Sequence, residues 1–102
     1  MLTVDILYTD DCEDWETAAH LVDEVLGELG LEAEFQYYLV ETDRQAIEWG
    51  FQGSPEIRVN GDYLFPAASA PAGKALRTYV TDEGVQGHPS VAMLREALEA
   101  YL

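Results

Sequence analysis

The chain has 102 residues, the size of one domain with a core of its own, and its 48% hydrophobic content argues against a disordered chain. Its 20 acidic residues against 5 basic ones give a net charge of −15. Domains that bind nucleic acids or anionic membranes need clustered lysine and arginine side chains, so this charge excludes both classes. The single cysteine, Cys12, excludes an internal disulfide and a zinc site built from several cysteines.

The acidic residues are spread along the chain rather than gathered in a tail. Self-repulsion of such a surface is costly in dilute buffer, but in about 1 M salt the Debye length falls to roughly 3 Å and most of that cost disappears. We therefore interpret the surface as halophilic, adapted to a salt-rich cytoplasm; the alternative is an ordinary acidic protein with a basic partner. A cytoplasmic location also agrees with the lack of a membrane-length apolar run and of a positively charged signal segment at the start.

The first two predicted elements are a strand and a long helix. Apolar side chains alternate along residues 2–8, which predicts a β-strand. Asp10 and Asp11 are predicted to cap a helix that runs from about residue 13 to residue 29, because apolar residues recur there every three to four positions. Gly30 is predicted to end this helix.

The next two elements complete a strand–helix–strand unit. Residues 33–39 alternate again and predict a second strand with one polar face. Thr42 and Gln45 fit a capping box, which opens a short helix that Gly50 ends. Elements of these lengths in this order predict a parallel βαβ unit.

The second half is predicted to add two strands and a helix. Residues 56–59 predict a third strand, and the Asn60–Gly61 turn follows it. Residues 62–74 are predicted to be a loop, and residues 75–80 to return antiparallel to the third strand. Ser90 is predicted to cap a final helix, whose inward face comprises Val91, Leu94, Leu98 and Tyr101.

The resulting order, β-α-β-α-β-β-α, predicts an α/β sandwich with a four-stranded mixed sheet, one domain over residues 1–102. Three local segments stand out: Asp11-Cys12-Glu13-Asp14-Trp15 at the first strand-to-helix junction, Thr42-Asp43 at the start of the short helix, and Gly53-Ser54-Pro55 before the third strand. With them, nearly the whole chain resembles the thioredoxin-like fold. The sequence motifs are most similar to those of small stand-alone thioredoxin-like proteins of bacteria and archaea, some of them labelled alkylmercury-lyase-like.

This resemblance implies thiol–disulfide chemistry with Cys12 as the sole nucleophile. It further implies that Pro55 is cis, that the Ser54-Pro55 loop lies beside Cys12, and that its exposed backbone pairs with an extended substrate; Trp15 would add to the substrate surface. Because Trp15 stands where the family has its second cysteine, a dithiol cycle is impossible and Cys12 would act as a monothiol. The implied partner is a low-molecular-weight thiol or a protein disulfide, on a monomer or weak homodimer, with no bound cofactor and no metal.

The charges around Cys12 oppose this chemistry. The amino end of a helix stabilises a thiolate by roughly 0.3–1 kcal/mol. A carboxylate about 4 Å away opposes it by on the order of 1 kcal/mol in water before screening. Carboxylates surround this cysteine in the sequence: Asp10, Asp11, Glu13, Asp14 and Glu16. The sequence therefore predicts a thiol that reacts slowly near neutral pH in dilute buffer.

Two other functions remain open. In the first, the fold is a non-catalytic binding module and Cys12 is a small buried hydrophobe. In the second, the thiolate binds a soft metal or an organomercurial. Asp5 is predicted to face solvent, and neither His20 nor His88 has a neighbour in sequence that predicts a metal or catalytic role.

Overall fold

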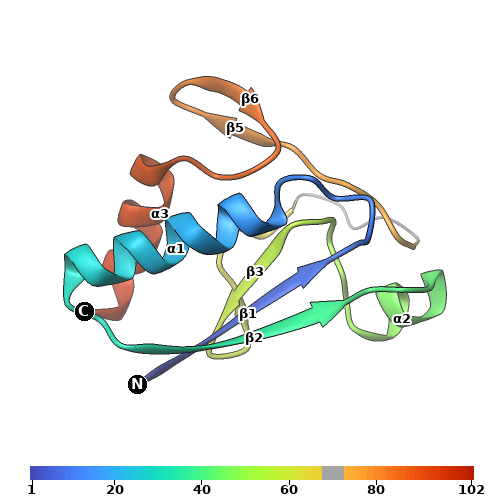
Figure 1. The fold of residues 1–102 in the computed structure, drawn as a ribbon, viewed down its shortest axis with the longest axis horizontal. Coiled ribbons are helices and arrows are strands. Elements are labelled where there is room, and N and C mark those ends of the chain that lie inside the picture. Colours follow the sequence, from blue (N-terminus) through green and yellow to red (C-terminus); the bar gives the residue numbers. More distant parts are fainter. Residues whose placement is uncertain (68–72) are drawn as a thin grey trace.

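The computed structural model describes residues 1–67 and 73–102, which form a mixed α/β fold (Figure 1). Its centre is a four-stranded sheet in the order β2-β1-β3-β4. Strand β1 (Leu2–Tyr8) pairs in parallel with β2 (Ala33–Leu39) and antiparallel with β3 (Glu56–Val59), and β3 pairs antiparallel with β4 (Asp62–Tyr63). The predicted α/β class and four-stranded mixed sheet are thus confirmed.

Two helices cover one face of this sheet. Helix α1 (Trp15–Leu29) and helix α3 (Val91–Leu98), the latter extended by the 3₁₀ turn η1 (Glu99–Tyr101), lie side by side in Figure 1. The alternation of β1 directs Val4 and Ile6 toward them. The core between the layers is completed by Val22, Val25, Leu26, Ile57, Val59, Leu94 and Leu98.

The opposite face is covered only at one end. Helix α2 (Asp43–Glu48) follows β2 and lies near the carboxyl ends of β1 and β2 (Figure 1). A second apolar cluster forms there from Leu7, Val40, Ala46 and Phe51, with Trp49 packed against it. The side chains of β1 and β2 that alternate with the main core therefore remain partly exposed toward the other end.

The predicted helix ends are confirmed with one correction. The Thr42 hydroxyl accepts from the Gln45 amide at 3.0 Å and caps α2, and the Ser90 hydroxyl accepts from the Met93 amide at 3.2 Å and caps α3. Helix α1 begins two residues later than predicted, after Asp14, so Asp10 and Asp11 do not cap it. The reason lies in the preceding turn, where the Asp11 carboxylate accepts from the Thr9 hydroxyl at 2.6 Å instead.

The fourth strand of the sheet was placed wrongly by the sequence pattern. Residues 62–63, predicted to be loop, form β4, whereas residues 75–80 do not join the sheet. Asn60 and Gly61 both have positive φ, as a two-residue hairpin turn requires, so the residues directly after them must pair with β3. The part of the predicted loop at residues 68–72 lies outside the described residues.

The remaining two strands form a hairpin of their own. Strand β5 (Tyr79–Thr81) pairs antiparallel with β6 (Gly84–Gln86), and this hairpin lies above the amino-terminal half of α1 in the view of Figure 1. The turn that joins these two strands lies between Thr81 and Gly84, which pair with each other. Among the described residues, no helix is both long enough and apolar enough to cross a bilayer.

Candidate functional site

Cys12 lies in the turn between β1 and α1 and is 7% exposed. Its amide donates to the Thr9 carbonyl at 3.2 Å. The side chain borders a cavity of about 350 Å³ that Ser54 also lines, so the two segments meet in space. The other described residues around this cavity are mostly polar: Asp11, Glu13, Asp14, Leu76, Arg77, Thr78 and Gly87.

Thr9 joins the cysteine turn to the Ser54 loop. Its carbonyl accepts from Cys12, while its amide donates to the Ser54 hydroxyl at 3.1 Å. Thr9 and Ser54 are each 1% exposed, so these bonds are protected from water. The peptide bond between Ser54 and Pro55 is cis, as the family resemblance implies for this loop. The structure thus brings Cys12 and the Ser54-Pro55 loop together.

The backbone of Ser54 is not available as the resemblance implies. Its amide donates to the Ala75 carbonyl at 2.8 Å, and its carbonyl accepts from the Arg77 amide at 3.0 Å. These bonds form a parallel bridge between Ser54 and Leu76. Residues 75–77 of the same chain therefore occupy the edge at which an extended substrate would have to pair.

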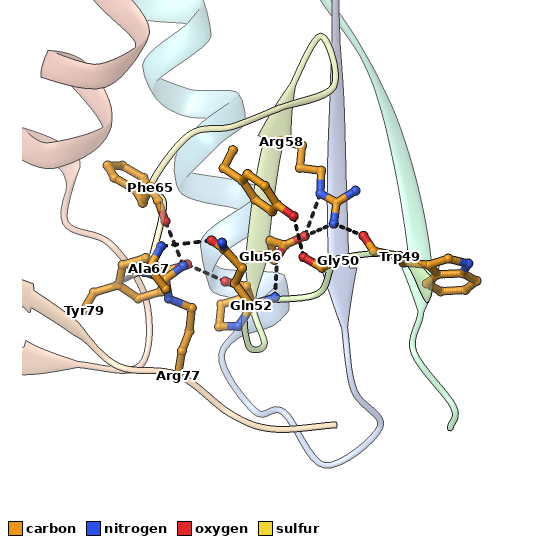
Figure 2. Close-up of polar contacts among 11 residues, drawn as sticks. Trp49, Gly50, Gln52, Glu56, Arg58, Phe65, Ala67, Arg77 and Tyr79 are labelled. Carbon is orange, nitrogen blue, oxygen red and sulfur yellow. Dashed lines mark hydrogen bonds and ion pairs between the residues drawn. The ribbon is translucent and has the colours of Figure 1, made fainter. Parts of the chain in front are cut away.

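Two residues that sequence reasoning missed support the Ser54-Pro55 loop. The hydroxyl of Tyr79, a buried side chain, donates to the Pro55 carbonyl, and burial raises the pKa of this phenol well above its usual range. The Arg77 guanidinium lies 4.3 Å from the centre of the Tyr79 ring and donates to the Phe65 carbonyl at 2.9 Å. Figure 2 shows these contacts around the Tyr79 ring. A local pattern cannot reveal the two hydrogen bonds, because they join residues 12 and 24 positions apart.

Trp15 is not among the described residues that line the Cys12 cavity. Its ring stacks on Tyr8, with ring centroids 4.1 Å apart, and meets Tyr37 edge-on at 5.8 Å. It borders a different cavity together with His20. The predicted substrate surface is therefore divided, with Cys12 and Ser54 together and Trp15 in an aromatic cluster over β1 and β2.

The predicted acidity of the site is present in space as well as in sequence. Asp11, Glu13 and Asp14 all border the Cys12 cavity, and the bond from the Thr9 hydroxyl lowers the pKa of Asp11. Arg77 is the one cation among the described lining residues. Within residues 1–67 and 73–102, no three histidine, cysteine or carboxylate side chains gather in a way that could hold a metal ion.

A second polar cluster lies under the loop that leads to Ser54. Glu56 is 1% exposed and accepts from the Gln52 amide at 2.6 Å and from Arg58 at 2.7 Å. Arg58 also donates to the Trp49 carbonyl, so the cluster ties residues 49–52 to β3 (Figure 2). Burial raises the pKa of Glu56, although the Gln52 amide and the charge of Arg58 act in the opposite direction. The alternation of Glu56 and Arg58 in sequence shows that they share a sheet face, but it does not show their burial.

Asp5 was predicted to face solvent, and the structure corrects this prediction in part. Its side chain is only partly exposed, and its Oδ1 atom is buried without a hydrogen-bond partner among the described residues. Burial raises the pKa of this carboxyl, and the nearby charge of Arg58 lowers it by less. The sheet explains the difference, because β3 lies beside β1 and covers the flank of Asp5.

Neither the models of known protein families nor the sequences of curated proteins give a match to this chain.

Proposed function

We propose that this is a thioredoxin-like protein whose Cys12 exchanges disulfides as a single thiol, and that its substrates are small disulfides rather than extended polypeptides. The observation that carries the proposal is that Cys12 and Ser54 line one cavity, held together by Thr9. The four-stranded mixed sheet and the loop geometry at Ser54-Pro55 support the fold assignment. A free thiol without a second cysteine agrees with a reducing compartment, for which we propose the cytoplasm.

The restriction to small substrates follows from the backbone of Ser54. An extended peptide would need both its amide and its carbonyl, and residues 75–77 already bond to both. A small disulfide needs only the cavity beside the sulfur. The volume of about 350 Å³ lies near the lower end of the roughly 300–1,000 Å³ that small-molecule sites span.

The reaction is ordinary thiol–disulfide exchange. The Cys12 thiolate attacks one sulfur of the small disulfide, the old S–S bond breaks, and a mixed disulfide with Cys12 forms while the other sulfur leaves as a thiolate that takes a proton from water. A second small thiolate then attacks the mixed disulfide, forms a new small disulfide and releases Cys12 as a thiolate. No net oxidation or reduction occurs within the chain.

Intact mass after brief exposure of the native protein to hydroxyethyl disulfide tests the proposal. We expect one adduct on the wild type and none on Cys12→Ser, and a slower reaction with a peptide-sized disulfide of the same sulfur chemistry. Equal or faster reaction with the peptide would contradict the substrate class. Reaction that occurs only in urea would contradict the exchange activity itself.

The second candidate function is a non-catalytic binding module. The observation in its favour is the 7% exposure of Cys12 together with the occupied edge of Ser54. In that case the native protein would carry no adduct, and Cys12→Ser would leave every binding property unchanged.

A further inference from the structure

The sheet face opposite α1 and α3 contains a second cavity. It has a volume of about 460 Å³, and its described lining residues differ from all of those around Cys12. It lies over β1, between β2 on one side and the Arg58 end of β3 on the other, and α2 closes one end. Six described residues line it: Asp5, Leu7, Tyr38, Glu48, Trp49 and Arg58.

Asp5 is the lining residue that indicates a ligand, because one of its carboxylate oxygens is unpaired within the described part of the chain. Its Oδ1 atom is buried and has no hydrogen-bond partner among the described residues. Leaving a buried polar atom unpaired costs about 1–3 kcal/mol, and more when the group is charged. A donor that enters the cavity and reaches this oxygen would recover that free energy.

Arg58 is the cation nearest in register, since it stands directly across from Asp5 on β3. Its guanidinium is nevertheless committed elsewhere: it pairs with Glu56 at 2.7 Å and donates to the Trp49 carbonyl. Figure 2 shows the guanidinium between these two acceptors. Arg58 therefore leaves the Asp5 oxygen unsatisfied, and its own charge is already balanced by Glu56.

Half of the described lining residues, Leu7, Tyr38 and Trp49, form an apolar and aromatic wall. Leu7 is buried on β1, and the rings of Tyr38 and Trp49 meet edge to face with centroids 6.3 Å apart. The Tyr38 hydroxyl donates to the Gln36 side chain at 2.7 Å, which fixes the ring. Aromatic faces attract cations, most strongly when water is excluded. Glu48, paired with Arg44 at 2.9 Å, adds a further carboxylate at the rim.

We propose that this cavity binds an organic ammonium ion, an amine whose N–H reaches Asp5 and whose apolar body lies on Leu7, Tyr38 and Trp49. The unpaired carboxylate oxygen specifies a donor, and the aromatic walls favour a positive charge on it. An anionic ligand would face Asp5 and Glu48 while Arg58 is already paired, so it is disfavoured. The net charge of −15 also attracts positively charged ligands from a distance.

Benzylammonium, with benzyl alcohol and benzoate as its neutral and anionic counterparts, tests the proposal on the full chain. The indole N–H signal of Trp49 in ¹⁵N-resolved NMR reports the cavity, and that of Trp15, identified through Trp15→Phe, is the internal control. We expect benzylammonium to shift Trp49 but not Trp15, and to bind at least about tenfold more tightly than benzyl alcohol. Benzoate is expected to bind more weakly than either.

Asp5→Asn is expected to abolish the preference for the ammonium ion over the alcohol. Glu34→Gln is the matched control, because Glu34 is an exposed carboxylate on the same sheet face outside the cavity and its loss should change affinity less than about twofold. Equal binding of benzylammonium and benzyl alcohol to the wild type would overturn the proposal without any variant. Stronger binding of benzoate, or an unchanged preference in a folded Asp5→Asn, would overturn it too.

Discussion

Thr9 is the residue on which the Cys12 cavity depends, although it contributes no reactive group. It stands directly after β1 and uses its carbonyl for Cys12, its amide for Ser54 and its hydroxyl for Asp11. The turn that holds Asp11 and Cys12 and the loop that holds Ser54 are thus joined through one buried residue. Ser54 supplies the only link in this set that comes from another part of the chain.

Ser54→Ala should therefore weaken both the fold and the protection of the thiol. It leaves the buried Thr9 amide without its acceptor, which costs about 1–3 kcal/mol of unfolding free energy. Urea unfolding measures the loss, and iodoacetamide labelling of Cys12 in native buffer should become faster. Thr42→Ala removes a helix cap and about 1 kcal/mol, so it is the control for general destabilisation. Equal labelling rates in the two variants would contradict a local role for Ser54.

Asp5 gives a prediction about pH. Burial raises its pKa in the folded chain, so the native state holds this proton more tightly than the unfolded state does. The contribution of Asp5 to stability is therefore greatest below its ordinary pKa and declines as pH rises through the folded value. Asp5→Asn cannot ionise and avoids that decline.

We expect the urea midpoint of Asp5→Asn to exceed that of the wild type at about pH 7, and the difference to close toward about pH 3. Glu34→Gln, an exposed carboxylate on the same face, should show no comparable gain. A difference that grows toward acid would mean that the pKa of Asp5 is lowered in the folded chain.

The meeting of Cys12 and Ser54 at one cavity was predictable, whereas the other residues around them were not. Cys12 and Ser54 stand at junctions between predicted elements, and the sequence resemblance indicates that such junctions meet. Arg77 and Tyr79 enter through long-range contacts that leave no local signal. The burial of Glu56 leaves no local signal either, because nothing in an alternating strand shows that a neighbouring loop covers its polar face.

The same division holds for the strands and helices. Elements with several repeats of their apolar pattern, β1, α1, β2 and α3, were predicted correctly apart from the first turn of α1, and the capping box indicated α2. Strand β4 has two residues, too few for any alternation, and only the Asn60–Gly61 turn could have indicated it. Residues 79–81 have a strand-like composition, but they pair with β6, the strand after the next turn, and not with the four-stranded sheet.

The loop between α2 and β3 offers a test of close packing. Gly53 has φ +121°, and a Cβ on it would lie 2.7 Å from the Cβ of Arg77. Gly61 also has positive φ, but a Cβ there would meet nothing within 4 Å. Both alanine variants carry backbone strain of about 1 kcal/mol or more, and Gly53→Ala carries a steric clash in addition.

We therefore expect Gly53→Ala to lower the urea midpoint clearly more than Gly61→Ala. It should also disturb the bridge between Ser54 and Leu76, which amide hydrogen exchange at Arg77 reports. Equal loss in the two variants would mean that the approach of residues 53 and 77 adds nothing to stability.

The charge of the whole molecule is far from balanced by its own ion pairs. Four salt bridges join described residues, and three of them involve partly or largely exposed side chains, which contribute little. With a net charge of −15, repulsion among the remaining carboxylates opposes the compact state. Salt should relieve it.

Molar KCl should raise the urea midpoint by about 1 M or more, since relief of roughly 2 kcal/mol divided by a slope of about 1–2 kcal/mol per M gives a shift of that size. Sucrose at the same osmolality stabilises by exclusion and does not screen charge, so it separates the two causes. Equal midpoints in dilute buffer and in KCl, or an equal rise in sucrose, would contradict the halophilic interpretation.

Because the bridge between Ser54 and Leu76 holds a segment that lines the Cys12 cavity, the reactivity of the thiol reports local opening of that segment. Cys12 is the only sulfhydryl of the chain and shares its cavity with Leu76, Arg77 and Thr78. Release of this short segment would bare the sulfur while the helices and the sheet stay intact, so chemical labelling can time a partial unfolding event that spectroscopy of the bulk fold would overlook. When the segment closes faster than the reagent reacts, the ratio of the labelling rates in native buffer and in urea gives the population of the opened form.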